Sequence, residues 1–172
     1  FQFSHHCVHE DGSVEHAHEF LNTNPGVFPN YDFIRNLKEA LCHDDGSIFR
    51  FSHHENTFLN HIYKQLMDDP ETIPDREELC DFIRSISKST KDSSKAWEGP
   101  RNTIDMCDLV KRFYYAPSTK GSNSIKQVLP AMLNTSDYLK EKYSQPLYGA
   151  EGGIKSCNFK DKAWIEIGAD GA

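Results

Sequence analysis

Residues 1–20 alternate between the two faces of an extended chain. Phe3 and Cys7 fall on one face of a first strand, and Phe20 belongs to the returning strand. Alternation with a period of two is typical of half-buried β-strands. The sequence Glu-Asp-Gly-Ser at 10–13 is typical of a tight turn between them. The pattern therefore predicts a β-hairpin over residues 1–20.

Apolar residues three and four positions apart, the spacing of one helix face, recur in three later segments. The first begins at Asn30, a residue type favoured as a helix N-terminal cap, the second follows residues 52–55, and the third covers residues 75–88. The residues predicted to face the core are Ile34, Leu37, Leu41, Phe58, Leu59, Ile62, Tyr63, Leu66, Leu79, Phe82, Ile83 and Ile86.

The second of these helices is preceded by a short β-prone run at residues 48–51. A strand that turns directly into a helix displays the residues of the turn, here His53, His54 and Glu55, at its carboxyl end. In open α/β sheets this edge is where ligands and catalytic groups usually lie. Asp105 follows Ile104 at the start of another apolar passage, and we expect it to lie at a strand end and face Glu55.

The order of predicted elements is typical of the α/β class, with flanking helices around a mixed sheet. At 172 residues the chain has the length of one domain. We expect an α/β core over residues 30–133, interrupted by a polar loop at 89–102, and a largely irregular C-terminal part at 134–172. Because the chain lacks an initiator Met and opens in a strand, we expect a piece of a longer protein.

Composition narrows the function classes. The net charge of −7 argues against a broad phosphate-neutralising surface, although metal-binding carboxylates in a nuclease are themselves acidic. No stretch approaches the roughly eighteen apolar residues of a membrane span, so we expect no membrane partner. The five cysteines include no Cys-x-x-Cys pair and are expected to be reduced in a cytoplasmic protein.

Histidine is in excess, with nine in the chain, and five of these lie in the hairpin. One interpretation is a zinc site that joins His5 and His9 to a partner on the opposite strand, and the other is a half-buried strand face. Two familiar zinc signatures are excluded by counting. A His-Glu-x-x-His helix requires His where Phe58 stands, and the deaminase signature requires a Pro-Cys-x-x-Cys segment that the chain lacks.

Two further groups of polar residues each leave two interpretations open. Glu55 is either a site residue or an ordinary acid in the first turn of a helix, where the helix dipole favours a carboxylate. The turn Lys-Gly-Ser-Asn-Ser at 120–124 either holds a phosphate at a helix N-terminus or simply caps that helix.

Several stretches together resemble an uncharacterised bacterial domain family of unknown function. They are Phe1–His6, His-Glu-Asn-Thr at 54–57 with Leu59, Asp105 with Tyr-Tyr-x-Pro at 114–117, and Lys-Gly-Ser-x-Ser-Ile-Lys-x-Val-Leu-Pro at 120–130. The similarity runs through most of residues 1–133. Members of that family resemble ribonuclease H-like folds of the DEDD exonuclease type, and they often share one polypeptide with a RecB-type nuclease module.

The resemblance implies a 3′–5′ exonuclease-like nuclease in the full-length parent, in which two Mg²⁺ or Mn²⁺ ions drive phosphodiester hydrolysis. Glu55 matches the acid of the second motif, although His54 stands where Phe is usual and Glu stands where Asp is usual. Asp105 matches an acid that follows this motif. Both are the expected catalytic residues and metal ligands. We expect Lys120, Ser122 and Lys126 to contact the nucleic-acid backbone.

The first and last acidic motifs of such nucleases have no counterpart in residues 1–172. Two carboxylates cannot clamp two divalent ions, so we expect this piece, truncated at both ends, to be inactive by itself. An absent central strand would leave an apolar sheet edge and favour a homodimer. The alternative is a non-catalytic module that positions nucleic acid or a protein partner for the attached RecB-type nuclease.

Overall fold

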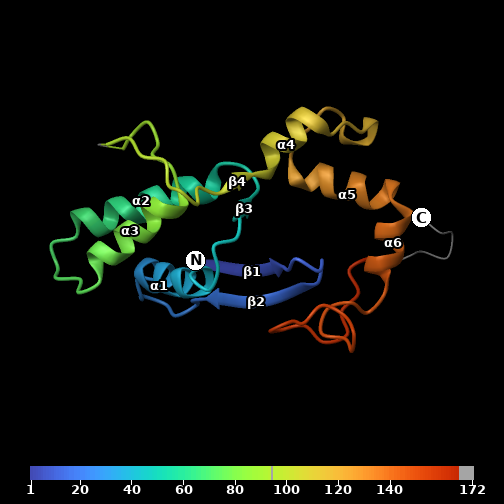
Figure 1. The fold of residues 1–172 in the computed structure, drawn as a ribbon, viewed down its shortest axis with the longest axis horizontal. Coiled ribbons are helices and arrows are strands. Elements are labelled where there is room, and N and C mark those ends of the chain that lie inside the picture. Colours follow the sequence, from blue (N-terminus) through green and yellow to red (C-terminus); the bar gives the residue numbers. More distant parts are fainter. Residues whose placement is uncertain (94, 167–172) are drawn as a thin grey trace. The chain divides into compact units, whose positions relative to one another are not determined.

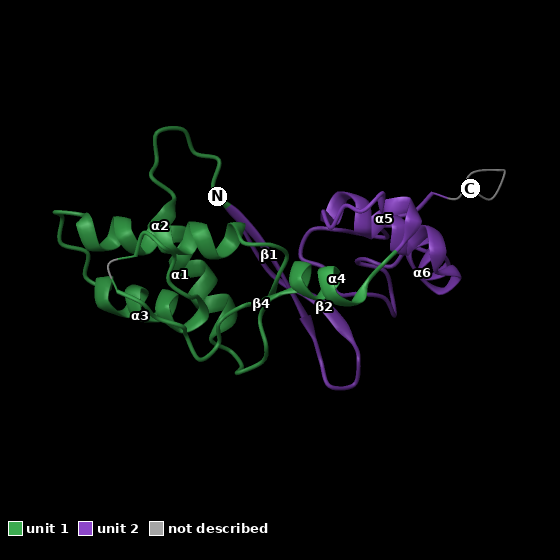
Figure 2. Ribbon diagram, turned by 90° about the horizontal axis from the view of Figure 1, so that it is seen from above, with its two compact units in different colours: residues 1, 22–115 green, residues 2–21, 116–172 purple. Residues whose placement is uncertain are grey.

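The computed structural model describes residues 1–93 and 95–166. Two compact units emerge, one made of residues 1 and 22–115 and the other of residues 2–21 and 116–172 (Figure 2). Helices and strands are both present, as the sequence predicts. In chain order (Figure 1), the elements are β1 (Gln2–Val8), β2 (Val14–Leu21), α1 (Asn30–Leu41), β3 (Phe49–Arg50), α2 (His54–Asp68), α3 (Arg76–Ile86), β4 (Ile104–Asp105), α4 (Met106–Phe113), the 3-10 helix η1 (Pro117–Thr119), α5 (Ile125–Thr135) and α6 (Asp137–Ser144).

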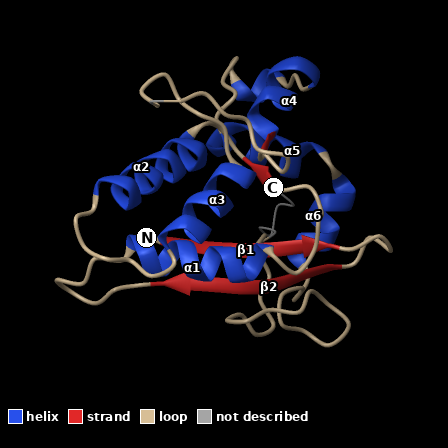
Figure 3. Cartoon of the chain, turned by 60° about the vertical axis from the view of Figure 1, so that its left-hand side comes forward, coloured by secondary structure: helices blue, strands red, loops and turns tan. Residues whose placement is uncertain are grey.

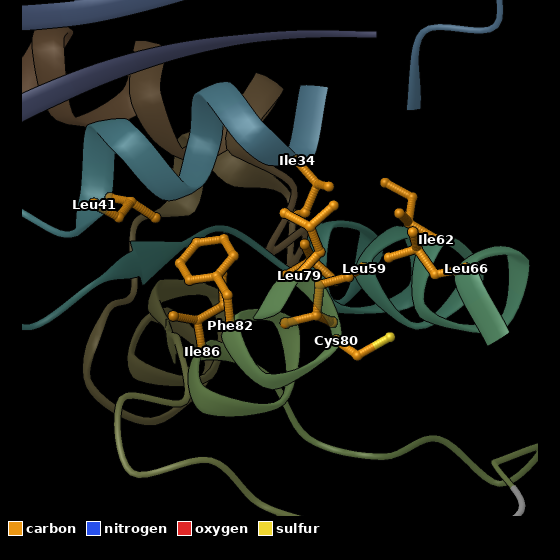
Figure 4. Packing of buried hydrophobic residues seen from close by; sticks show 10 residues of the cluster. Ile34, Leu41, Leu59, Ile62, Leu66, Leu79, Cys80, Phe82 and Ile86 are labelled. Atoms are coloured by element: carbon orange, nitrogen blue, oxygen red, sulfur yellow. The ribbon is translucent and has the colours of Figure 1, made fainter. Parts of the chain in front are cut away.

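Helices α1, α2 and α3 form the core of the first unit. Their apolar faces meet as the periodicity predicts, and Ile34, Ile62, Leu66 and Ile83 are at most 1% exposed. Figure 4 shows side chains from all three helices directed into this cluster. Phe58 is the exception among the predicted core residues. It is 48% exposed, and its ring packs edge-on against the ring of Phe1.

The predicted cap of α1 is wrong by one residue. The helix already includes Asn30, and Pro29 occupies the cap position without a side-chain hydrogen bond. Asn30 is instead buried, and its amide nitrogen donates to Gln65 Oε1 of α2 at 2.6 Å. The side chain thus joins two helices rather than closing the end of one.

Two buried asparagines of α2 hold the chain that leaves α3. Asn56 Oδ1 accepts from the Lys88 backbone N–H at 2.9 Å, and Asn56 Nδ2 donates to the Lys88 carbonyl at 3.0 Å. Asn60 Nδ2 donates to the same carbonyl at 2.9 Å. Lys88 pairs with Glu98 in an isolated antiparallel bridge, and the two amides satisfy its backbone N–H and carbonyl, as buried backbone groups require. They anchor the beginning of the predicted polar loop.

The strands of the described residues form two separate two-stranded sheets, where the sequence predicts one mixed sheet. β1 and β2 pair antiparallel, with Gln2 opposite Leu21 and Val8 opposite Val14, which confirms the predicted hairpin (Figure 3). β3 and β4 form a parallel pair. Each has only two residues, because the apolar run at 48–51 ends in a turn at Ser52 and β4 passes at once into α4.

The second unit contains the hairpin, η1, α5, α6 and an irregular segment after α6. Ser124 caps α5, as the sequence predicts, by accepting from the Lys126 N–H. Pro130 lies inside the helix without ending it. In the irregular segment, the rings of Tyr148, Phe159 and Trp164 contact one another edge-to-face. Within the part of the chain that the structure describes, no helix has the length and apolar character needed to cross a membrane.

The Asn56–Lys88 contact generates a stability prediction. Asn56→Ala leaves a buried N–H and a weakened carbonyl contact without compensation, so we expect the free energy of unfolding to fall by about 2 kcal/mol. Asn36→Ala is the matched control, because Asn36 is exposed on α1 and should cost less than about 0.5 kcal/mol. Urea denaturation of both variants measures the difference, and equal losses would contradict the anchoring role of Asn56.

Candidate functional site at the carboxyl end of strands β3 and β4

Strands β3 and β4 run parallel, with Phe49 beside Ile104 and Arg50 beside Asp105. Both strands therefore end at the same edge. β3 leads through residues 51–53 into α2, and β4 leads directly into α4. This arrangement matches the predicted strand-to-helix corner, and the carboxyl edge of parallel strands is the usual position of ligand sites in α/β proteins.

Asp105 occupies the centre of this corner. Its Oδ1 accepts two backbone hydrogen bonds, from Ser52 N at 2.8 Å and from Cys107 N at 2.9 Å. The second bond caps the N-terminus of α4. Its Oδ2 lies 3.5 Å from a terminal nitrogen of Arg50, and the side chains of Arg50 and Asp105 are only 7% and 13% exposed. One carboxylate therefore joins β3, the turn after it and the start of α4.

Arg50 belongs to the same network and donates hydrogen bonds to the turn and to the residue before β4. Its Nε donates to the Ser52 carbonyl at 2.8 Å. One terminal nitrogen donates to both the carbonyl and the hydroxyl of Thr103, at 2.8 and 2.6 Å. A charge that is so little exposed needs both an opposite charge and hydrogen-bond acceptors, and Arg50 has both.

The turn at Ser52 is strained. Its φ of 78° lies in the left-handed region, which costs a residue with a side chain roughly 1–2 kcal/mol. The strain is offset because Asp105 holds the Ser52 N–H and Arg50 holds the Ser52 carbonyl. The left-handed turn reverses the chain between β3 and α2, so that the following residues begin α2 at the strand edge.

His53, His54 and Glu55 follow this turn and are exposed. The two imidazole centroids lie 4.4 Å apart, and the Ser52 hydroxyl lies 3.2 Å from His53 Nδ1. Glu55 lies in the first turn of α2. No hydrogen bond or ion pair joins its carboxylate to Asp105 or to any other described residue. The structure therefore places both predicted acids at one edge but does not bring their carboxylates into contact.

The donor set at this edge does not fit the two-metal site that the resemblance implies. Divalent Mg²⁺ and Mn²⁺ require several oxygen ligands, and a pair of ions requires bridging carboxylates. The oxygens of Asp105 are engaged by two N–H groups and a guanidinium, which leaves Glu55. Across residues 1–93 and 95–166, no group of three or more His, Cys, Asp and Glu side chains is arranged to hold a metal ion, the hairpin histidines included.

The predicted nucleic-acid contacts lie in the second unit. Lys120 has a left-handed φ of 51° and ends η1, and both Lys120 and Lys126 are exposed. The Ser122 hydroxyl accepts from Ser124 N at 3.2 Å, as the capping interpretation of this turn predicts. Lys120 in the turn and Lys126 in the first turn of α5 are therefore exposed positive charges of this segment.

A separate hollow of about 570 Å³ lies beside the C-terminal half of α2. The rings of Phe28, Tyr31 and His61 and the carboxylates of Asp68 and Asp69 are part of its lining. Burial, followed by the hydrogen bond to Asp69, raises the pKa of Tyr31 to about 12. The ammonium of Lys64 also lines this hollow and pairs with the Asp68 carboxylate, so the charges at this hollow include both signs.

A comparison with models of protein families shows which family this chain matches. Residues 1–124, which make up most of the chain, match the family described as Domain of unknown function (DUF2779). The chain belongs to the DUF2779 family. Comparisons with curated proteins and with solved structures find no match. The match confirms the resemblance to an uncharacterised domain family, and it includes Glu55, Asp105, Lys120 and Ser122 but ends before Lys126.

Sequence reasoning missed two residues of this DUF2779 corner, Arg50 and Ser52. Arg50 carries a signal in retrospect, because a charge between Phe49 and Phe51 in an apolar run needs a partner if the run is buried. Ser52 carries no comparable signal, since a left-handed serine follows from the contacts of Arg50 and Asp105 rather than from local preference.

The network predicts that substitution of Asp105 lowers the stability of the protein much more than substitution of the nearby Asp108. Asp105→Asn keeps the capping oxygen but removes the charge opposite Arg50. We expect the free energy of unfolding to fall by about 2 kcal/mol. This is less than the usual cost of breaking a buried ion pair, because Arg50 retains its carbonyl and hydroxyl acceptors. Asp108→Asn is the control. Asp108 is exposed, and the hydrogen bond from Lys111 lowers the pKa of its carboxyl. Its substitution should cost less than about 0.5 kcal/mol.

Thermal and urea unfolding of both variants measure this difference. A fall in stability for Asp105→Asn that is no larger than that for Asp108→Asn would show that the Arg50 contact does not hold the corner together.

Proposed function

We propose that this DUF2779 chain is a non-catalytic module that binds nucleic acid and works beside a RecB-type nuclease in a longer cytoplasmic protein. The observation that carries the proposal is the engagement of Asp105. An acid that caps α4, holds the Ser52 turn and faces Arg50 performs a structural task with both of its oxygens. The corner then serves to present the residues that follow Ser52.

Each unit by itself exposes groups that fit contact with single-stranded nucleic acid. In the first unit, the imidazole rings of His53 and His54 offer flat surfaces on which unpaired bases stack, and in the second unit Lys120 and Lys126 attract phosphates. The net charge of −7 limits non-specific attraction, so binding depends on a few local contacts. In this proposal the carboxyl edge of β3 and β4 serves for binding rather than for hydrolysis.

A second candidate is the metal-dependent nuclease itself, with two-metal hydrolysis of DNA or RNA. One observation favours it, because Glu55 is an exposed carboxylate at the carboxyl edge of a parallel strand pair. Under this candidate Glu55 binds Mg²⁺ or Mn²⁺ together with carboxylates from outside residues 1–172, and Asp105 orients the corner.

The binding proposal predicts a measurable role for two lysines. The Lys120→Ala, Lys126→Ala double variant should bind labelled single-stranded DNA and RNA about tenfold more weakly, with a salt dependence reduced by about two ions. Lys160→Ala provides the matched control, since Lys160 is exposed in the same unit. Fluorescence anisotropy at several salt concentrations measures both. Failure of the unmodified chain to bind either strand would contradict the proposal, as would an equal loss in the control.

Degradation of end-labelled single strands with Mn²⁺ separates the two candidates. The complete parent protein is used, with any RecB-type module inactivated, and Glu55→Ala is compared with Asp108→Ala. The binding proposal predicts that neither substitution changes degradation. A loss of about a hundredfold or more in Glu55→Ala alone would instead assign Glu55 to a metal site and establish the nuclease.

A further inference from the structure

Four histidines of the β1–β2 hairpin form two stacked pairs across the strands. The rings of His5 and His18 lie 5.7 Å apart and 16° from parallel, and those of His6 and His16 lie 4.8 Å apart and 10° from parallel. A register shift falls between His5 and His6. It allows consecutive residues of β1 to stack on alternate residues of β2.

His16 also joins the hairpin to the irregular segment after α6. The residue is only 2% exposed, and its two ring nitrogens lie 3.1 Å from the Ser4 hydroxyl and 3.3 Å from the Ser156 hydroxyl. Its backbone N–H donates to the Lys155 carbonyl at 2.8 Å. The Cys157 thiol donates to the His16 carbonyl at 3.2 Å. Residues 155–157 are therefore attached to β2 at this histidine.

His6 lies between this attachment and the aromatic cluster of the same segment. Its ring meets Tyr148 at a centroid distance of 5.7 Å and an angle of 66°. Burial raises the pKa of Tyr148, so its hydroxyl stays neutral throughout the range in which histidine titrates. Among the described residues, the titratable side chains that interact with His6 are thus His5, His16 and Tyr148, none of which carries a carboxylate.

The two acids of β2 are engaged elsewhere. Glu15 lies 3.4 Å from the His9 ring and 3.5 Å from the Lys155 ammonium. Glu19 accepts a hydrogen bond from Asn158. His6 as a whole residue is exposed, but the desolvation of its ring, followed by the positive charge of neighbouring His16 and His5, lowers the pKa of His6 below its ordinary value of 6.5. A proton on His6 therefore meets two imidazoles rather than a carboxylate.

We propose that the stacked histidines form a proton-sensitive latch that keeps residues 147–164 on the β1–β2 hairpin while His6 is neutral and releases them when it is protonated. The proton comes from solvent and adds to an imidazole nitrogen, with no other bond made or broken. The charge then lies within stacking distance of His16, which holds residues 155–157. The latch is independent of the nucleic-acid proposal.

The direction of the pH effect follows from proton binding. When the segment is released, His6 has its ordinary pKa near 6.5. When the segment is docked and Tyr148 contacts the ring, the pKa of His6 is lower. The released state therefore takes up more protons as the pH falls below 6.5, and acid favours it. Docking is fully stable above this pH and weakens as the pH falls toward the lowered pKa.

Hydrogen exchange measured by mass spectrometry tests the latch. Between about pH 7.5 and about pH 5.5, after correction for intrinsic exchange rates, exposure of residues 147–164 should rise by up to about tenfold, which is the limit for one linked proton one pH unit below 6.5. His6→Phe keeps a flat ring but cannot take a proton, so its exposure should stay nearly constant. His43→Phe, at an exposed histidine of the first unit, should behave like the unmodified chain.

Three results would overturn the latch. One is hydrogen exchange of residues 147–164 that does not change with pH in the unmodified chain. Another is a rise of the same size in the exchange of these residues in His6→Phe. The third is an equal rise in α1, α2 and α3, which would indicate general acid unfolding rather than release of one segment. His6→Gln, which is neutral but polar, must reproduce the profile of His6→Phe, so that poor folding of the phenylalanine variant cannot mimic the expected result.

Discussion

The ion pair between Arg50 and Asp105 is the contact on which the β3–β4 corner depends. A two-residue parallel ladder has too few backbone hydrogen bonds to fix its own register. The charged pair fixes the register of the two strands, because Arg50 can reach Asp105 and Thr103 together only in the observed alignment. A buried ion pair adds little net stability over apolar packing, but breaking it is costly. Its value here lies in selecting one arrangement of the strand, the turn and the helix.

Much of the first unit could be predicted because its information is local. The spacing of Leu79, Phe82, Ile83 and Ile86 fixes which face of α3 is buried, and each of these residues is buried in the structure. The hairpin follows in the same way from alternation and a turn. The errors occur where a side chain has a distant partner. Asn30 is a good cap by residue type, yet it bonds to α2. No local pattern reveals a bond between residues of two helices.

The site shows the same division between local and distant information. The change from β-prone to helical spacing predicts a strand-to-helix corner near Glu55, and β3 and α2 form one. The predicted encounter of Glu55 with Asp105 required knowledge of where Arg50 points. The excess of histidine in the hairpin was likewise plain in the sequence, but the two stacked pairs depend on the register shift after His5. The composition of the sequence thus points to the hairpin as an unusual region, but only the structure shows which of its histidines interact.

The two tasks open to Asp105 make opposite demands on its carboxylate. A metal ligand needs free lone pairs directed at the ion, with the positive charge of the ion as its principal partner. A structural acid needs its oxygens filled by N–H donors. For Asp105 to ligate a metal, either Arg50 must give up its opposite charge while remaining 7% exposed, or Ser52 must lose the bond that offsets its left-handed backbone. Both changes dismantle the corner that displays Glu55. Of the two acids at this edge, only Glu55 could therefore ligate a metal without loss of the corner, while Asp105 keeps the corner in place.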